Sequence, residues 1–130
     1  MSKKVLVVDD DPDVVSFVMT VLDENQYMPL VAKDGVEGLE MIEKNPPDLV
    51  ILDVLMPRGS GIRLYHKLKT MEKYRRIPII MFTGISLNSF LKSQKVLDEF
   101  KGEVVPEPDI YLEKPVDPEE LAAAVKKKIG

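Results

Sequence analysis

The sequence predicts an α/β fold in which helices cover both faces of a five-stranded parallel sheet. Short apolar runs alternate with longer amphipathic stretches five times along the chain, which is typical of repeated βα units. The apolar runs span residues 5–8, 28–31, 49–52, 79–82 and 110–112. Apolar runs of this length are typical of strands that are buried on both faces of a parallel sheet.

The expected strand order is 2-1-3-4-5, in a doubly wound, flavodoxin-like (βα)5 sheet. Right-handed crossovers leave few arrangements of five parallel strands, and this order is the common one. Pro29 supports it independently, because a proline cannot donate a ladder hydrogen bond and therefore belongs on an edge strand. The first and third strands contain no proline, so we expect them at the centre of the sheet.

Further signals mark the helices. Apolar residues recur at helical spacing in the first and fourth intervals between strands: Val14, Val15, Val18, Val21 and Leu22, then Leu87, Phe90, Leu91, Leu97 and Phe100. Asp11 precedes Pro12 and Asp117 precedes Pro118, so both aspartates are expected to be N-caps. Gly130 stands where the last helix should end.

Length and composition restrict the class of protein. A chain of 130 residues has the usual length of one domain, and we expect a single domain over residues 1–130. The net charge of −4 argues against direct binding of nucleic acid, which normally requires a basic surface. The absence of cysteine excludes disulfides and thiolate metal sites. Only four apolar residues separate Lys4 from Asp9, too few for a signal peptide or a membrane span, so we expect a cytoplasmic protein that does not contact a membrane.

Three carboxylates follow the ends of two strands that should be neighbours. Asp9 and Asp10 follow the first strand, and Asp53 follows the third. Ligands bind at this edge of an open parallel sheet, and like charges so close together repel unless a cation or a shared proton relieves them. A cluster of oxygen ligands suits Mg²⁺. A single aspartate after a strand is more often a cap or turn residue, and Asp11 keeps that interpretation.

Short motifs stand at the ends of four expected strands. Their residues are Asp9, Asp10, Asp53, Met56, Pro57, Gly61, Thr83, Gly84, Lys114 and Pro115. With these motifs the chain resembles the response-regulator receiver domain of two-component signalling. Each motif alone is weak, but their order at the first, third, fourth and fifth strands is specific, and the resemblance covers nearly the whole chain. It implies a phosphoprotein of a phosphorelay that carries an aspartyl phosphate. Such a domain is not an enzyme, since it catalyses only its own phosphorylation and dephosphorylation.

The resemblance implies a role for each site residue. Asp53 is the expected phosphoacceptor, and Lys114 is expected to contact the phosphoryl oxygens. Mg²⁺ is expected to bind Asp9, Asp10 and Asp53 together with the backbone carbonyl of Leu55. These roles agree with the chemistry, because phosphoryl transfer needs an in-line nucleophile and neutralisation of the equatorial oxygens.

The resemblance also implies an output. Thr83 matches the switch hydroxyl that moves to bond the phosphoryl group, and Tyr111 matches the coupled aromatic residue. The expected partners are a histidine kinase or phosphotransfer protein as donor and a downstream protein that contacts the fourth helix, fifth strand and fifth helix. A dimer formed on phosphorylation is compatible with this output.

Two departures from the family pattern stand out, and one histidine needs an interpretation. Thirty residues separate Thr83 from Lys114, more than the family's usual spacing, so we expect an extended loop over residues 101–109 and a fourth helix that stops near Gly102. This loop either adds or blocks partner contacts, or it is a spacer. Ser60 stands where many relatives carry an acid, without a role in the mechanism, and His66 is interpreted as an ordinary surface residue without a partner.

Other functions fit less well. A haloacid-dehalogenase-type phosphatase needs a second acid two residues after the nucleophile, where this chain has Leu55. A flavin or dinucleotide carrier needs a glycine- or hydroxyl-rich loop after the first strand, where this chain has acids. The remaining alternative is a receiver-like interaction module that is no longer regulated by phosphorylation.

Overall fold

The computed structural model describes residues 2–101 and 105–130, with the backbone alone described for residues 96–101. The strands are β1 (Lys4–Val8), β2 (Met28–Ala32), β3 (Leu49–Leu52), β4 (Ile79–Thr83) and β5 (Ile110–Glu113). The helices are α1 (Pro12–Glu24), α2 (Gly35–Lys44), α3 (Ser60–Thr70), α4 (Leu87–Lys101) and α5 (Pro118–Ile129), and a short 3₁₀ turn, η1 (Pro57–Gly59), precedes α3.

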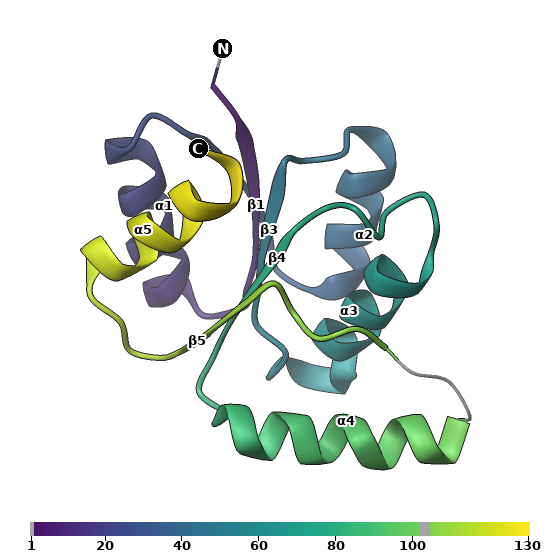
Figure 1. The fold of residues 1–130 in the computed structure, drawn as a ribbon. Coiled ribbons are helices and arrows are strands. Elements are labelled where there is room, and N and C mark those ends of the chain that lie inside the picture. Colours follow the sequence, from purple (N-terminus) through teal and green to yellow (C-terminus); the bar gives the residue numbers. More distant parts are fainter. Residues whose placement is uncertain (1, 102–104) are drawn as a thin grey trace.

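The five strands form one parallel sheet in the order β2-β1-β3-β4-β5, which confirms the expected topology. Figure 1 shows α1 and α5 together on one face of the sheet and α2 and α3 on the other. Pro29 lies in β2, which stands at the end of the strand order next to β1, so the inference that proline marks an edge strand is confirmed.

Side chains of the central strands alternate between two apolar cores, one on each face of the sheet. In β1, Leu6 and Val8 pack with α2, α3 and α4, whereas Val5 and Val7 pack with α1 and α5. All four side chains are at most 1% exposed. Because successive side chains of a strand point to opposite faces, burial on both faces requires the continuous apolar run that the sequence contains.

The two predicted N-caps differ. The carboxylate of Asp11 accepts a hydrogen bond from the backbone N of Asp13 at 2.9 Å, as expected for the start of α1. Asp117 occupies the N-cap position of α5, but its side chain makes no capping bond, so that prediction is only half right. Its backbone carbonyl accepts hydrogen bonds from Glu120 and Leu121, and Pro118 supplies the helical φ at N1.

The segment before β5 corrects part of the expectation of an extended, solvent-facing loop. α4 ends at Lys101, as expected, and residues 102–104 lie outside the described part of the chain. Val105, however, is only 7% exposed and belongs to the core between the sheet and α3. The hydroxyl of Tyr65 donates a hydrogen bond to the carbonyl of Pro106. Pro106 and Glu107 are exposed, as predicted, so the prediction was wrong for Val105. The two prolines exclude helix, but they do not prevent a neighbouring apolar side chain from packing in the core.

Candidate functional site

The three predicted aspartates converge at the carboxyl edge of the sheet. The backbone N of Asp53 donates to the carbonyl of Val8 at 3.0 Å, so the loop after β3 lies against the end of β1. Asp9, Asp10 and Asp53 each place one carboxylate oxygen within 4.8 Å of the others. Asp9 and Asp53 are buried, whereas Asp10 is exposed. A cluster made only of oxygen donors, open to solvent through Asp10, fits a hard divalent cation that keeps several of its waters.

Lys114 joins the same cluster from the end of β5. Its Nζ lies 2.9 Å from Oδ2 of Asp9 and 3.1 Å from Oδ2 of Asp53. The backbone N of Lys114 donates to the carbonyl of Thr83 at 2.8 Å, which extends the β4–β5 ladder to the point where the side chain turns inward. The peptide bond between Lys114 and Pro115 is cis. Lys114 therefore belongs to the site, as the sequence predicts.

In this cluster, burial and the neighbouring charges shift the pKa values of the ionisable groups in opposite directions. Burial raises the pKa of Asp9, and hydrogen bonds from the backbone of Asp11 and from Lys114 offset that shift only in part. Burial lowers the pKa of Lys114, but its hydrogen bonds to the two carboxylates and their negative charge outweigh burial, so its pKa lies above the ordinary value. Asp9 and Asp53 thus hold Lys114 in its cationic form, and one ammonium cannot balance the three carboxylates of the cluster.

The backbone around Asp53 fixes the direction of its carboxylate. Oδ1 accepts a hydrogen bond from the backbone N of Leu55 at 2.9 Å, while Oδ2 faces Lys114. A Cβ at Gly61 would lie 2.3 Å from the carbonyl oxygen of Asp53, so only glycine lets the start of α3 approach this closely. The predicted use of the Leu55 carbonyl as a metal ligand stays a prediction.

The two expected switch residues lie beside the cluster. Thr83 is fully buried, and its Oγ1 has no hydrogen-bond partner among the described residues. Tyr111 is half-buried and its hydroxyl donates to the carbonyl of Ile85 at 2.6 Å. Burial, followed by the charges of Glu113 and Asp53, raises the pKa of Tyr111 to about 12. Thr83 thus has an unused hydroxyl at the carboxyl edge of the sheet, while the hydroxyl of Tyr111 is already bonded.

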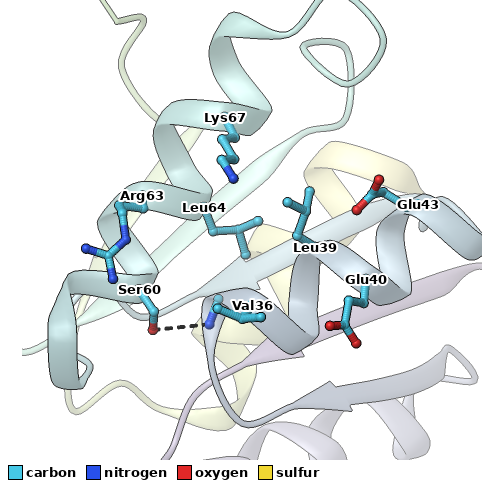
Figure 2. A pocket seen from close by; sticks show the side chains of 9 residues that line it. Val36, Leu39, Glu40, Glu43, Ser60, Arg63, Leu64 and Lys67 are labelled. Atoms are coloured by element: carbon cyan, nitrogen blue, oxygen red, sulfur yellow. Dashed lines mark hydrogen bonds between the residues drawn. The ribbon is translucent and has the colours of Figure 1, made fainter.

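Two residues that the sequence analysis left without a role make specific contacts. Ser60 is buried, and its Oγ accepts a hydrogen bond from the backbone N of Gly35 at 3.2 Å, which joins the starts of α2 and α3 (Figure 2). His66 is half-buried, and its Nε2 lies 2.8 Å from Oε1 of Gln94 on α4. The interpretation of His66 as a surface residue without a partner was wrong, because its partner is far away in the sequence.

Comparison with known proteins decides the family. Residues 5–126 match the model of the response regulator receiver domain. The chain belongs to this family. The chain is 32% identical over 126 residues to the phosphate regulon transcriptional regulatory protein PhoB of Escherichia coli, and the match covers 97% of this chain and 51% of PhoB. It is 35% identical over 130 residues to the sensor histidine kinase TmoS of Ectopseudomonas mendocina, covering 98% of this chain and 12% of TmoS.

Solved structures agree with this assignment. The chemotaxis response regulator CheY4 of Vibrio cholerae superimposes with a TM-score of 0.81 at 26% identity, covering 99% of this chain and all of that one. The receiver domain spans about half the length of the first curated relatives it matches. None of its described helices is long and apolar enough to cross a membrane. The predicted family and fold are confirmed, and the family acts in two-component signalling.

Proposed function

We propose that this receiver domain accepts a phosphoryl group on Asp53 from a histidine kinase or a phosphotransfer protein. The observation that carries the proposal is the position of Lys114 Nζ, 3.1 Å from Asp53 Oδ2, beside a carboxylate cluster that would hold a divalent cation. An ammonium at this distance from the nucleophilic oxygen is close enough to bind the oxygens of a phosphoryl group that Asp53 attacks. Catalysis would be limited to phosphorylation and dephosphorylation of the domain itself.

Mg²⁺ is the cation that suits this donor set. Asp9, Asp10, Asp53 and the backbone carbonyl of Leu55 would hold it. When bound, the cation would neutralise the developing charge on the phosphoryl oxygens. Asp53 Oδ1 is held by the backbone N of Leu55, which orients the carboxylate before transfer, and Lys114 holds the other oxygen. The chain's own residues thus preorganise the nucleophile.

The proposed response passes through Thr83 and Tyr111. A phosphoryl group on Asp53 offers acceptor oxygens to the buried, unbonded hydroxyl of Thr83, and movement of Thr83 leaves space beside β5 that the ring of Tyr111 can fill. The ring of Tyr111 lies 5.5 Å from that of Phe90 on α4, so its position is coupled to α4. The surface of α4, β5 and α5 is therefore the proposed contact for a downstream protein, or for a second copy after phosphorylation.

The remaining features of the proposal follow from the family. Residues 1–130 are proposed to form a single receiver domain, supported by a match that spans residues 5–126. The net charge of −4 supports an output through proteins rather than through direct contact with nucleic acid. We place the phosphotransfer in the cytoplasm, where ATP-dependent kinases supply phosphoryl groups.

Substitution at Asp10 tests the proposal. Asp10→Asn removes one charge from the cluster, so Mg²⁺ binding should weaken and phosphorylation by acetyl phosphate should be lost, while the fold remains. The measurements are an Mg²⁺ titration followed by calorimetry and mass spectrometry after incubation with the donor. The matched control is Asp48→Asn, which removes the same charge at the opposite edge of the sheet. Equal Mg²⁺ affinity in Asp10→Asn and the parent would contradict the site; a parent that binds Mg²⁺ but is never phosphorylated would favour an interaction module.

A further inference from the structure

A pocket lies directly beside the acidic cluster of Asp9, Asp10 and Asp53. It has a volume of about 350 Å³ and lies between the β2–α2 turn, the η1 turn and the start of α3. Its charged lining residues are Asp10, Lys33, Asp34, Arg58 and Arg63, and we call it the rim pocket. Asp10 is shared with the metal cluster, so a ligand in the rim pocket would lie next to the proposed phosphoacceptor site.

The three cations of the rim pocket have no ion-pair partner in the part of the chain whose side chains the structure describes. Within residues 2–95 and 105–130, the side chains of Lys33, Arg58 and Arg63 form no ion pair. The carboxylate of Asp34 is already used, since it accepts a hydrogen bond from the backbone N of Glu37 at 2.8 Å as the N-cap of α2. Arg63 also lines a neighbouring pocket between α2 and α3, where Figure 2 shows it on the same side as Ser60, with Glu40 and Glu43 on the opposite side. The rim therefore has free positive charge.

Arg58 adopts a backbone conformation that is unfavourable for arginine. Its φ is 63° and its ψ is 16°, in the left-handed region, and Gly59 follows with a φ of 64°. A glycine at position 58 would adopt this conformation without the steric cost that a Cβ brings. Strained residues of this kind concentrate at functional sites. Arg58 lies five residues after Asp53, and the strained turn places Arg58 in the lining of the rim pocket.

Electrostatics explains why a cationic rim would be useful here. With the proposed divalent cation bound, the charges of three carboxylates, Lys114 and the cation cancel, so the inner site alone does not attract an anion over a distance. Lys33, Arg58 and Arg63 outnumber the single additional acid of the rim, Asp34. Clustered charge beside a site raises the local concentration of an oppositely charged reactant.

We propose that the rim pocket is an entry site for small dianionic acyl phosphates, in which Arg58, Lys33 and Arg63 bind the phosphoryl group before it reaches Asp53. This inference rests on the proposed function, because it assigns a class of phosphodonor to the same site. In the transfer, an oxygen of Asp53 forms a bond to phosphorus while the bond between phosphorus and the carboxylate oxygen of the donor breaks. The carboxylate leaves with that electron pair, and no further reactant is needed.

Phosphorylation kinetics with two donors test the proposal. In Arg58→Gln, the half-saturating concentration of acetyl phosphate should rise about threefold to tenfold, while the maximal rate stays within about twofold, because the rim acts on encounter and not on chemistry. Phosphoramidate carries less negative charge than acetyl phosphate, so Arg58→Gln should raise its half-saturating concentration less. Arg58→Lys keeps the charge and should restore most of the binding. Arg76→Gln, an exposed arginine at the opposite edge of the sheet, is the control and should match the parent.

Two further measurements are needed. One separates the effect of the Arg58 charge from that of its backbone strain, and the other separates failure of the entry site from failure of the proposed function. Arg58→Gly should raise the thermal midpoint yet weaken acetyl phosphate binding as Arg58→Gln does. Acetonylphosphonate, an unreactive analogue, should shift the NMR signals of the rim in both the parent and Asp53→Asn, and less in Arg58→Gln. If neither donor phosphorylates the parent, the proposed function is wrong. If both do and Arg58→Gln matches the parent with each donor, only the entry site is wrong.

Discussion

The ammonium nitrogen of Lys114 lies 3.1 Å from the Oδ2 atom of Asp53. The same nitrogen lies 2.9 Å from Oδ2 of Asp9, so Lys114 holds two carboxylates that come from different strands. In the metal-free protein, Lys114 is thus the counterion of the cluster. It competes for the same oxygens that a divalent cation would use.

Replacement of Lys114 should therefore have opposite effects on metal binding and on phosphorylation. In Lys114→Ala, Mg²⁺ affinity should rise about threefold to tenfold, because a competing positive charge is gone. Phosphorylation by acetyl phosphate should slow by about a hundredfold, the usual cost of removing one group that stabilises transition-state charge. Calorimetry and timed mass spectrometry measure the two effects. Lys126→Ala, at an exposed position on α5, should change neither; weaker Mg²⁺ binding in Lys114→Ala would contradict the account.

The buried hydroxyl of Thr83 offers a second prediction. Thr83→Val has nearly the same shape and removes a hydroxyl that has no partner among the described residues, so the free energy of unfolding should stay equal or rise by up to about 1 kcal/mol. Asp53 should still be phosphorylated, but the NMR shifts of α4 and β5 should no longer respond to phosphorylation. Urea unfolding and spectra with and without acetyl phosphate test this; a full response in Thr83→Val would exclude Thr83 as the switch.

A salt bridge away from the site leads to a pH prediction. The Oδ2 atom of Asp109 accepts hydrogen bonds from Nζ of Lys69 and from the backbone N of Ile79, both at 2.8 Å. Burial raises the pKa of Asp109, but these two donors and the charge of Lys69 outweigh burial and hold the pKa below its usual value of 3.8. A lowered pKa stabilises the fold above 3.8, and this contribution is lost as the pH falls through the folded-state pKa.

Asp109→Asn should therefore destabilise the protein at neutral pH by about 1–2 kcal/mol, a value reduced for the partial exposure of the pair. The difference from the parent should shrink below pH 4 and vanish once Asp109 is protonated in both states. Urea titrations at several pH values measure it. Glu72→Gln, at an exposed position, is the control. A difference that stays constant from neutral to acid pH would contradict this role of the Asp109 charge.

The segment before β5 yields a prediction about packing. Val105 is 7% exposed and lies in the core, so Val105→Ala should lower the free energy of unfolding by about 2 kcal/mol. Glu107 is exposed in the same segment, and Glu107→Ala should stay within about 0.5 kcal/mol of the parent. Urea unfolding tests both. Equal stabilities of the two variants would contradict the role of Val105 in the core. Because deletion of 103–108 would remove a core residue, partner contacts are better tested by substitution at Glu107.

Local patterns in the sequence predict most of the fold and the site. The apolar runs, Pro29 and the aspartates after two strands suffice for the sheet order and for the convergence of Asp9 and Asp53. The contacts that were missed all join residues far apart in the sequence. His66 and Gln94, or Tyr65 and Pro106, carry no periodic signal, because a single hydrogen bond between two helices or to a loop leaves no pattern along the chain.

Ser60 illustrates the same limit. A serine after a turn could cap a helix, bind a ligand or face solvent, and nothing beside it in the sequence distinguishes these roles. Its hydrogen bond with Gly35 depends on the packing of α2 against α3, which no local pattern in the sequence encodes. A Cβ at Gly35 would lie 2.1 Å from the carbonyl oxygen of Ser60, which explains why a glycine opens α2. The left-handed conformation of Arg58 also could not be predicted from the sequence, since arginine is not a residue typical of left-handed turns.

The central claim is that Asp53 carries the phosphoryl group, and chemical mapping of the modified residue tests it most directly. The protein is incubated with acetyl phosphate and Mg²⁺, and borohydride then reduces any acyl phosphate to an alcohol that survives digestion. Peptide mass spectrometry should find homoserine at position 53 in the parent, and no reduced residue in Asp53→Asn or when Mg²⁺ is withheld. A reduced residue at Asp9 or Asp10, a stable phosphate on a serine or threonine, or no modification at all would contradict the claim.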